Sequence, residues 1–214
     1  MLQHKRRRKP NRNGSRQVLL ATAGALFARH GFHQVSVDLI AKRAGVAKTA
    51  LYHHFGNKEG LVIDFLESHI EDLEDSLIDA VRKHTGPRAR LRAVFDWHTR
   101  WFRQPEFAGS VFLRATHEYT GKQDLIEELS RVQKRSLRHA VRVLLEACGV
   151  PRTRSDDLAH SMVYLLDGAT VSATVLDEFD AADRAWRAAE LLLDSEVDRE
   201  RGAESANGAC GAAC

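Results

Sequence analysis

The sequence predicts an all-α protein, in which an N-terminal three-helix helix-turn-helix domain precedes a C-terminal domain of six mostly longer helices. Apolar residues recur every three or four positions along most of the chain, as they do on one face of a helix. No window alternates between apolar and polar residues for long enough to indicate a strand. Glycines and prolines divide the periodic stretches, and these breaks set the predicted helix boundaries.

The charges are divided unevenly between the two ends of the chain. Residues 1–58 hold twelve Lys and Arg and one acid, Asp38, whereas residues 59–214 hold twenty bases and twenty-eight acids. The net charge of +3 therefore conceals a strongly basic N-terminal quarter. Because such a region attracts polyanions, we expect the N-terminal domain to bind nucleic acid.

Residues 1–14 are expected to form a disordered basic arm, since they contain Pro, Gly and Asn but no periodic apolar positions. The run from Lys5 to Lys9 has two interpretations. It is either a solubilising tail or an arm that adds contacts to phosphates or to the minor groove of DNA.

Residues 15–57 are predicted to form the helix-turn-helix domain, with Ser15 capping its first helix. The expected helices are residues 16–30, 37–44 and 48–55. Gly31, Gly45 and Gly56 follow these helices directly, where a left-handed residue commonly ends a helix. Ser36 precedes the second helix as a hydroxyl cap.

Residues 58–196 are predicted to form a ligand-binding and dimerisation domain, followed by a disordered tail over 197–214. Apolar spacing and the breaks between periodic stretches place its six helices. They are expected over residues 57–82, 88–103, 105–117, 123–147, 154–178 and 181–195.

The helix over 48–55 is expected to be two-sided. Leu51 and Phe55 lie four residues apart and turn inward. The residues left on the outer surface are Lys48, Thr49, Tyr52 and His53. In a helix-turn-helix the second of the two helices enters the major groove of DNA. We therefore expect Lys48 and Thr49 to approach base edges, while Tyr52 and its histidine neighbours contact phosphates.

The stretch "GFHQVSVDLIAKRAGVAKTALYHHFGNKEGL" resembles the TetR (tetracycline-repressor-like) transcriptional regulators. The resemblance implies a homodimer whose last two helices form a four-helix bundle. It also implies seven DNA contacts: Ser36, Lys48, Thr49, Tyr52, His53, His54 and Lys58. Ala47 stands where the family often has a serine, so the third helix lacks a hydroxyl cap. Thr49-Ala50 replaces a pair that frequently contains glycine, so base preference should differ from that of close relatives.

Aromatic and histidine residues are concentrated in the middle helices, where the resemblance places an effector pocket. For any single one of them, core packing is the more common explanation. Taken together, they predict the wall of a ligand cavity between helices. The candidates are Trp97, His98, Trp101, Phe102, Phe112, His117 and Tyr164.

Small residues on the helix over 154–178 indicate close helix packing, which serves either the core of one chain or a subunit interface. We favour the interface, because one recognition helix covers only a few base pairs and two copies are needed. The candidates are Gly168, Ala169, Ser172, Ala173, Trp186, Ala189 and Leu193.

No cofactor, metal site or catalytic motif is predicted. The eleven histidines are scattered, and no HExxH, GxSxG or phosphate-binding loop occurs. Cys148, Cys210 and Cys214 form no zinc-like pattern. No apolar run is long enough to span a membrane, so we expect a cytoplasmic protein with no membrane partner.

The sequence therefore predicts a homodimeric repressor that binds a palindromic operator in double-stranded DNA and is released by a small-molecule effector. Three alternatives remain: a transcriptional activator, an architectural DNA-binding protein without effector control, and a helical ligand-binding module that has lost DNA binding. An enzyme would need a constellation of catalytic residues that the sequence does not offer.

Overall fold

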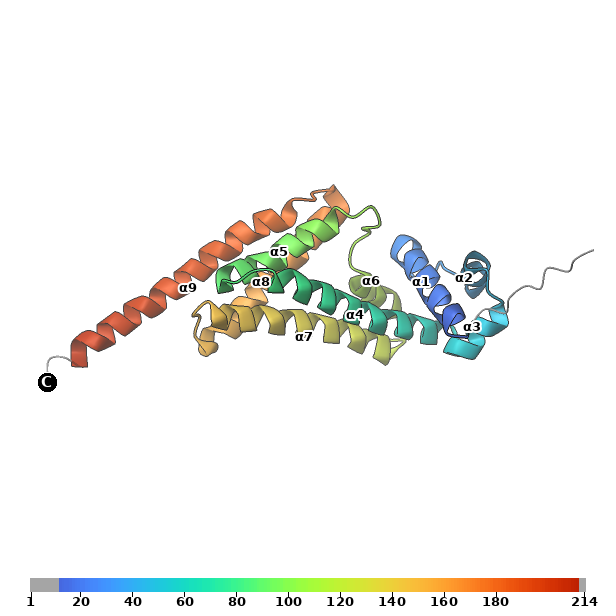
Figure 1. The fold of residues 1–214 in the computed structure, drawn as a ribbon, viewed down its shortest axis with the longest axis horizontal. Coiled ribbons are helices and arrows are strands. Elements are labelled where there is room, and N and C mark those ends of the chain that lie inside the picture. Colours follow the sequence, from blue (N-terminus) through green and yellow to red (C-terminus); the bar gives the residue numbers. More distant parts are fainter. Residues whose placement is uncertain (1–11, 212–214) are drawn as a thin grey trace, which may run out of the picture. The chain divides into compact units, whose positions relative to one another are not determined.

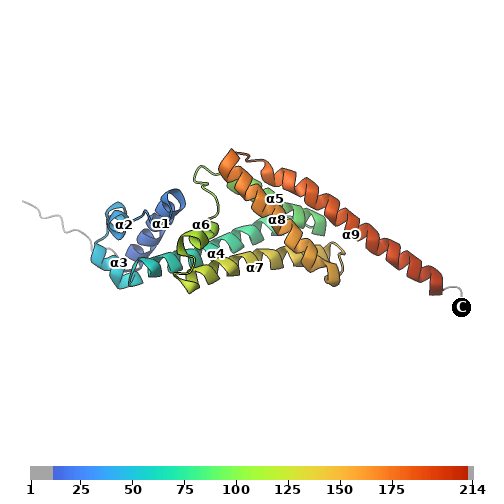
Figure 2. The same ribbon diagram turned by 180° about the vertical axis from the view of Figure 1, so that it is seen from behind.

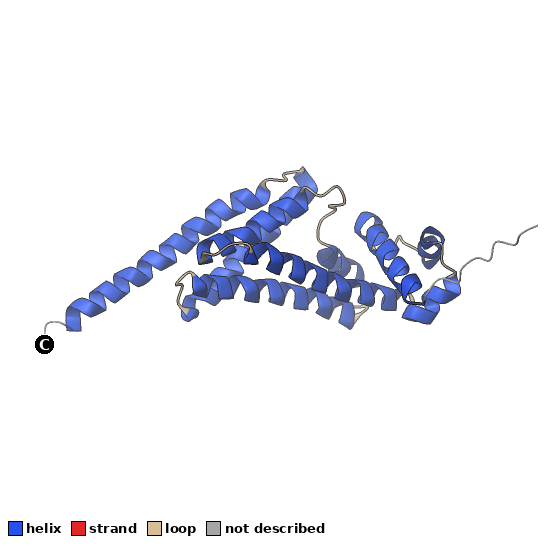
Figure 3. Ribbon diagram, viewed as in Figure 1, coloured by secondary structure: helices blue, strands red, loops and turns tan. Residues whose placement is uncertain are grey.

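The computed structural model describes the backbone of residues 12–211 and the side chains of residues 14–200. Over these residues the chain forms nine helices joined by loops, which confirms the all-α prediction (Figures 1 and 3). The helices are α1 (Arg12–His30), α2 (Val37–Ala44), α3 (Lys48–Phe55), α4 (Lys58–Arg82), α5 (Pro87–Phe102), α6 (Val111–Tyr119), α7 (Asp124–Ala147), α8 (Arg152–Leu176) and α9 (Ala181–Gly211).

Helices α1 to α3 pack around one small apolar core. Phe27, Phe32, Ile40 and Leu51 are fully buried there. Helix α1 begins at Arg12, so the expected start after Ser15 was one turn too late, and Ser15 is a buried residue within the helix rather than its cap. The remainder of the predicted arm, residues 1–11, lies outside the described residues.

The ends of the short helices follow the predicted capping. The Ser36 hydroxyl accepts a hydrogen bond from the Leu39 amide at 3.1 Å, which satisfies a donor in the first turn of α2. Gly45 ends α2 with φ 64°, in the left-handed region that favours glycine. Ala47 provides no side-chain cap to α3, as expected from its missing hydroxyl.

The chain divides into two compact units. The division between them differs from the predicted boundary between residues 57 and 58. The first unit, which we call the head, comprises the described residues up to His69 together with Val111–Leu129. It therefore includes the first part of α4 and all of α6. The side chains explain this grouping, because Phe65 of α4 lies 5.8 Å from the Phe27 ring, and Tyr119 of α6 lies 5.9 Å from the Phe32 ring.

The second unit, which we call the body, comprises Ile70–Ser110 and the residues from Ser130 onward. Its core lies between α5, α8 and α9, with the Phe95 and Trp186 rings 5.3 Å apart in an edge-to-face contact (Figure 2). Arg88 at the start of α5 pairs with Glu190 at 2.8 Å and with Asp194 at 2.5 Å. These contacts fix α9 against α5.

Helix α9 continues to Gly211, so the prediction of a disordered tail from residue 197 was wrong over most of its length. Val197 packs against the body core, and the Arg154 side chain from α8 binds Glu196 at 3.0 Å. Alanine, glutamate and arginine are frequent in this segment and favour helix formation, which outweighs the unfavourable effect of its glycines. Residues 212–214 lie outside the described residues.

Candidate DNA-binding surface and ligand cavity

Helix α3 has the two sides that its sequence predicted. Leu51 is fully buried and Phe55 is nearly so. Lys48, Thr49 and His53 are exposed, and Tyr52 retains 45% of its accessible surface. The buried side anchors α3 to α1 and α2, so its polar side faces solvent on a rigid support.

Lys48 is held in place on this surface by the preceding helix. Its Nζ lies 2.8 Å from Oδ1 of Asp38 in α2 and 6.0 Å from the centre of the Tyr52 ring. The hydrogen bond to Asp38 raises the pKa of Lys48. Asp38 is the one acid among the first 58 residues, and it restrains a lysine that is expected to contact DNA.

The other predicted DNA contacts are less exposed or already bonded. The Ser36 hydroxyl caps α2, and the Lys58 ammonium donates to the His33 carbonyl at 3.4 Å. Burial lowers the pKa of Lys58. His54 is half-buried, with its ring 5.4 Å from that of His53. All seven candidates nevertheless belong to the head, on or beside α2 and α3.

Helix α6 forms hydrogen bonds with the end of α1 and with the turn between α1 and α2, an arrangement that the sequence did not predict. The Glu118 carboxylate accepts hydrogen bonds from the Phe32 amide at 3.1 Å and from the His33 amide at 2.6 Å. Arg114 donates to the Ala28 carbonyl at the end of α1, at 2.9 Å. Gly31 has φ 80°, and a Cβ there would lie 2.6 Å from Glu118 Oε1, so the close approach requires glycine. We call these contacts the α6 clamp.

Comparison with known proteins identifies the head. The family model described as "Bacterial regulatory proteins, tetR family" matches residues 19–65, from α1 into α4. Residues 19–65 of this chain therefore form a TetR-family domain. The chain is 33% identical over 137 residues to the HTH-type transcriptional activator FasR of Mycolicibacterium smegmatis, a match that covers 64% of this chain and 56% of FasR.

Two further comparisons extend the likeness. The HTH-type transcriptional repressor KstR2 of Rhodococcus jostii is 36% identical over 83 residues, which cover 39% of this chain and 41% of KstR2. The crystal structure of SCO4454, a TetR-family regulator from Streptomyces coelicolor, superposes with a TM-score of 0.80 at 24% identity, covering 86% of this chain and 96% of SCO4454. The head thus carries the DNA-binding domain of TetR-family transcriptional regulators, and the fold of most of the chain is that of SCO4454.

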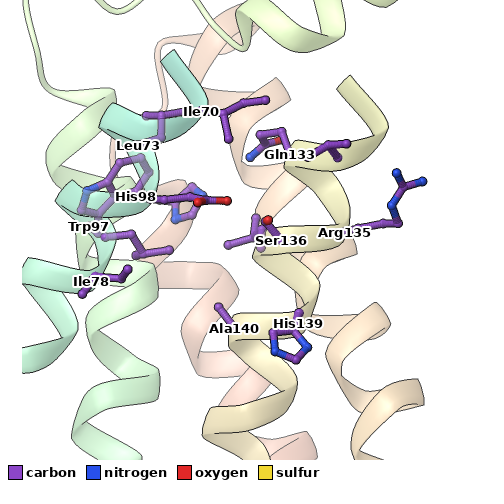
Figure 4. Close-up of a pocket in the computed structure, with 14 residues that line it drawn as sticks. Ile70, Leu73, Ile78, Trp97, His98, Gln133, Arg135, Ser136, His139 and Ala140 are labelled. Atoms are coloured by element: carbon purple, nitrogen blue, oxygen red, sulfur yellow. The ribbon is translucent and has the colours of Figure 1, made fainter. Parts of the chain in front are cut away.

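The body contains a cavity of about 510 Å³ between α4, α5 and α7. Trp97 and His98 line it from α5 and lie opposite Gln133 and Ser136 of α7 (Figure 4). Its other lining residues are Ile70, Leu73, Glu74, Leu77, Ile78, Val132, Arg135, Leu137, His139 and Ala140. Apolar side chains from α4 and α7 therefore form most of the wall.

Only Trp97 and His98 of the seven predicted cavity residues line this space. Trp101 and Phe102 pack against Phe107 instead, with ring centres 5.0 and 5.2 Å from it. Phe112 is buried in the head, stacked on His69 at 5.6 Å. His117 and Tyr164 are exposed to solvent and do not line this cavity.

The lining residues of α4 and α7 were missed because their helical spacing looked like ordinary core spacing. Leu73 and Leu77 lie four positions apart, as residues of a buried helix face do, and nothing local distinguishes a core leucine from one that lines a cavity. Only the tertiary arrangement, in which α7 leaves space beside α4, separates the two roles.

The predicted interface residues are mostly internal to one chain. Ala169, Ala173, Trp186, Ala189 and Leu193 are all less than 7% exposed and belong to the body core. The small residues of α8 thus allow α8 and α9 of the same chain to approach each other, which was the simpler alternative. Gly168 is exposed and Ser172 half-buried, on the side of α8 that faces away from the core.

His98 is a buried, uncharged histidine. It is 5% exposed, and its Nδ1 lies 2.8 Å from the Val94 carbonyl, one turn earlier in α5. A carbonyl can only accept, so Nδ1 carries the proton and Nε2 is the acceptor. Burial lowers the pKa of His98 to about 4, so the ring is neutral at neutral pH.

His98 is expected to make the folded protein sensitive to acid. Its folded pKa of about 4 lies below the ordinary value of 6.5, so the unfolded chain takes up the proton first as the pH falls. The stabilisation is present above pH 6.5 and is lost as the pH falls towards 4. Between pH 7 and pH 5 the free energy of unfolding should decrease by about 2 kcal/mol more in the wild type than in His98→Gln.

Urea denaturation of both proteins across this pH range measures that difference. All other titrating groups are common to the two proteins, so the His98→Gln curve supplies the background. Equal pH dependence of the two stabilities would contradict a buried neutral His98.

The cysteines and histidines that the sequence analysis considered form no further functional site among the described residues. Cys148 is half-buried against the body core, and burial raises its pKa. The side chains of Cys210 and Cys214 lie outside the described residues. Within the described part of the chain, no cluster of His, Cys, Asp or Glu is arranged to hold a metal ion, and no helix is long and apolar enough to cross a bilayer.

Proposed function

We propose that this TetR-family protein is a homodimeric repressor that binds a palindromic operator and leaves it when a small molecule enters the body cavity. The observation that carries the proposal is the two-sided α3, which anchors Leu51 in the head core and presents Lys48, Thr49 and Tyr52 to solvent. Its polar side fits the role of a recognition helix in the major groove. Such a protein acts in the cytoplasm, where its operator lies.

Two exposed apolar stripes support a second copy of the chain. On α8, Tyr164, Val171 and Val175 are 67%, 49% and 70% exposed, and on α9 Leu191 is 72% exposed. Each stripe lies on the side of its helix opposite to the buried side. Exposed large apolar residues in such number mark an interaction site, and a two-fold axis would bury the stripes against their own copies.

The two-fold assembly sets the DNA target. Two copies of α3 would enter successive major grooves about one helical turn apart, so the operator would be a palindrome or nearly so. Base preference would come from Lys48 and Thr49 near the start of α3. Tyr52, His53, His54, Ser36 and Lys58 would fix the position of the head on the phosphates.

Helix α4 provides a route from the cavity to the head. It is continuous from Lys58 to Arg82, with Leu61 and Leu66 buried in the head and Leu73 and Leu77 lining the cavity. A ligand that favours a tilted α4 would change the separation of the two α3 helices. A coupling of about 1–3 kcal/mol would weaken DNA binding by roughly 5- to 150-fold.

The direction of control has a second candidate, because FasR is named as an activator and KstR2 as a repressor. An activator would occupy its operator and raise transcription in a reporter assay, whereas a repressor would lower it. An architectural protein without effector control is a further alternative, and footprints without a preferred site would favour it.

Two substitutions at the proposed phosphate contacts test the DNA-binding role. Tyr52→Phe removes a hydroxyl that has no hydrogen-bond partner among the described residues, and should weaken binding by roughly 2- to 10-fold at every sequence. Lys58→Ala should also weaken binding at every sequence and reduce the salt slope by about one unit.

Fluorescence anisotropy with operator and random duplexes at several salt concentrations measures both effects. Lys83→Ala is the matched control, because Lys83 is an exposed lysine just beyond the end of α4 and should leave affinity and slope unchanged. A loss of affinity confined to one DNA sequence would contradict the phosphate role of Tyr52 or Lys58.

A further inference from the structure

The body cavity has an unsatisfied hydrogen-bond acceptor at its wall. His98 carries its proton on Nδ1, which donates to the Val94 carbonyl at 2.8 Å. Nε2 has no hydrogen-bond partner among the described residues, and His98 lines the cavity. Because burial lowers the pKa of this ring to about 4, Nε2 stays an acceptor at neutral pH and does not become a donor.

Two more polar side chains face the same space. Gln133 and Ser136 of α7 point toward the side of the cavity that Trp97 and His98 occupy (Figure 4). Neither side chain has a hydrogen-bond partner in the part of the chain that the structure describes. Each can donate as well as accept, so they accommodate a polar group without fixing its chemistry.

Charged groups around His98 are balanced or directed elsewhere. Lys134 and Asp167, the two ionised residues that influence His98, form an ion pair with each other. Arg135 points away from Trp97 and His98 (Figure 4). Glu74 lines the cavity but is exposed, so water screens its charge. A charged ligand would therefore gain no buried counter-ion beside His98 and would lose its hydration.

The remaining wall is mainly apolar, and its polar residue His139 is exposed to solvent. Ile70, Leu73 and Val132 contribute aliphatic surface, and the indole N–H of Trp97 is already bonded to the Ser76 hydroxyl at 2.9 Å. A volume of about 510 Å³ lies in the range of small-molecule sites. The wall therefore favours the apolar body of a small molecule, held by one polar contact.

We infer that the effector is an uncharged, mainly apolar molecule with a hydroxyl or amide N–H that donates to Nε2 of His98. This inference deepens the proposed function, since it rests on the cavity being the effector site. Hydrogen-bond donation to Nε2 of His98 would then determine which molecules bind. An acceptor in the same place would meet the His98 lone pair and leave it unpaired.

Four probes with the same ten-carbon chain test this class. Decan-1-ol donates a hydrogen bond, decyl methyl ether only accepts, decanoate is an anion, and decyltrimethylammonium is a cation. Isothermal titration calorimetry of the full chain should show decan-1-ol binding about tenfold more tightly than the ether, and more tightly than either ion.

His98→Leu should bind decan-1-ol and the ether equally, within about twofold, because the acceptor is gone and the apolar wall remains. His139→Leu is the matched control, since His139 also lines the cavity but is exposed, and it should keep the tenfold preference. Thermal denaturation of each variant confirms that it is folded.

Several outcomes would overturn the inference. Equal binding of decan-1-ol and the ether to the wild type, tighter binding of either ion, or an alcohol preference that survives in His98→Leu each contradicts it, as does a wild type that binds none of the four probes. Operator binding is measured in parallel by anisotropy. If decan-1-ol binds through His98 without changing operator affinity, the proposed release by the effector is wrong and the ligand class stands. If the protein binds its operator but shows no preference for the alcohol, the ligand class is wrong and the DNA-binding role stands.

Discussion

Replacing Leu191 with glutamate is expected to convert the protein from a dimer to a monomer and to weaken operator binding more than 100-fold. Leu191 is 72% exposed in the single chain, so the fold of each copy should tolerate the change. In the proposed dimer the same position lies within an apolar contact, where a buried unpaired carboxylate costs several kcal/mol. Without the partner, one α3 must bind its half-site alone.

Sedimentation velocity measures the oligomeric state, and anisotropy with the operator measures the affinity. Leu125→Glu is the matched control, because Leu125 is also an exposed leucine, at 50%, but lies on α7 in the head. A Leu191→Glu protein that remains dimeric would contradict the proposed interface. A monomeric variant with full operator affinity would contradict the need for two copies.

Replacing Glu118 with alanine is expected to reduce the free energy of unfolding of the head by about 3 kcal/mol. Its carboxylate accepts hydrogen bonds from the amides of Phe32 and His33, at 3.1 and 2.6 Å, and each such charge-assisted bond contributes about 1.5 kcal/mol. With the clamp weakened, the α1–α2 turn should lose its fixed position against α6. Operator affinity and its response to effector should both decrease.

Chemical denaturation followed by circular dichroism measures the stability change. Glu118→Gln keeps one carbonyl oxygen as an acceptor and should lose about half as much stability. Glu106→Ala removes an exposed glutamate from the loop before α6 and is the control. If Glu118→Ala is no less stable than Glu106→Ala, the α6 clamp does not stabilise the head.

The head was predictable because its signals are local. Ser36 marks the start of α2, Gly45 and Gly56 mark the ends of α2 and α3, and the four-residue spacing of Leu51 and Phe55 fixes which side of α3 is buried. Each of these features depends on residues a few positions apart. The sequence therefore specified both the helices and the exposed side of α3.

The body was predicted less well because its roles depend on distant partners. Ala173 and Leu193 looked suited to a subunit interface, yet they pack within one chain, and the exposed side carries Val171 and Val175 instead. Small-residue spacing shows that two helices meet but not whether they belong to the same copy. The α6 clamp joins residues 85 positions apart, and no local pattern identifies such a contact.

One footprinting measurement tests the central proposal most directly. DNA selected by the purified protein from a random pool is probed with hydroxyl radicals at about 0.1 M salt, with no effector present. We predict two related half-sites, protected on one side of the duplex about one helical turn apart, and loss of both protected patches when Lys48 and Tyr52 are replaced together by alanine. No enrichment of any sequence, or protection that persists in the double variant, would contradict a dimer that binds DNA through the outer side of α3.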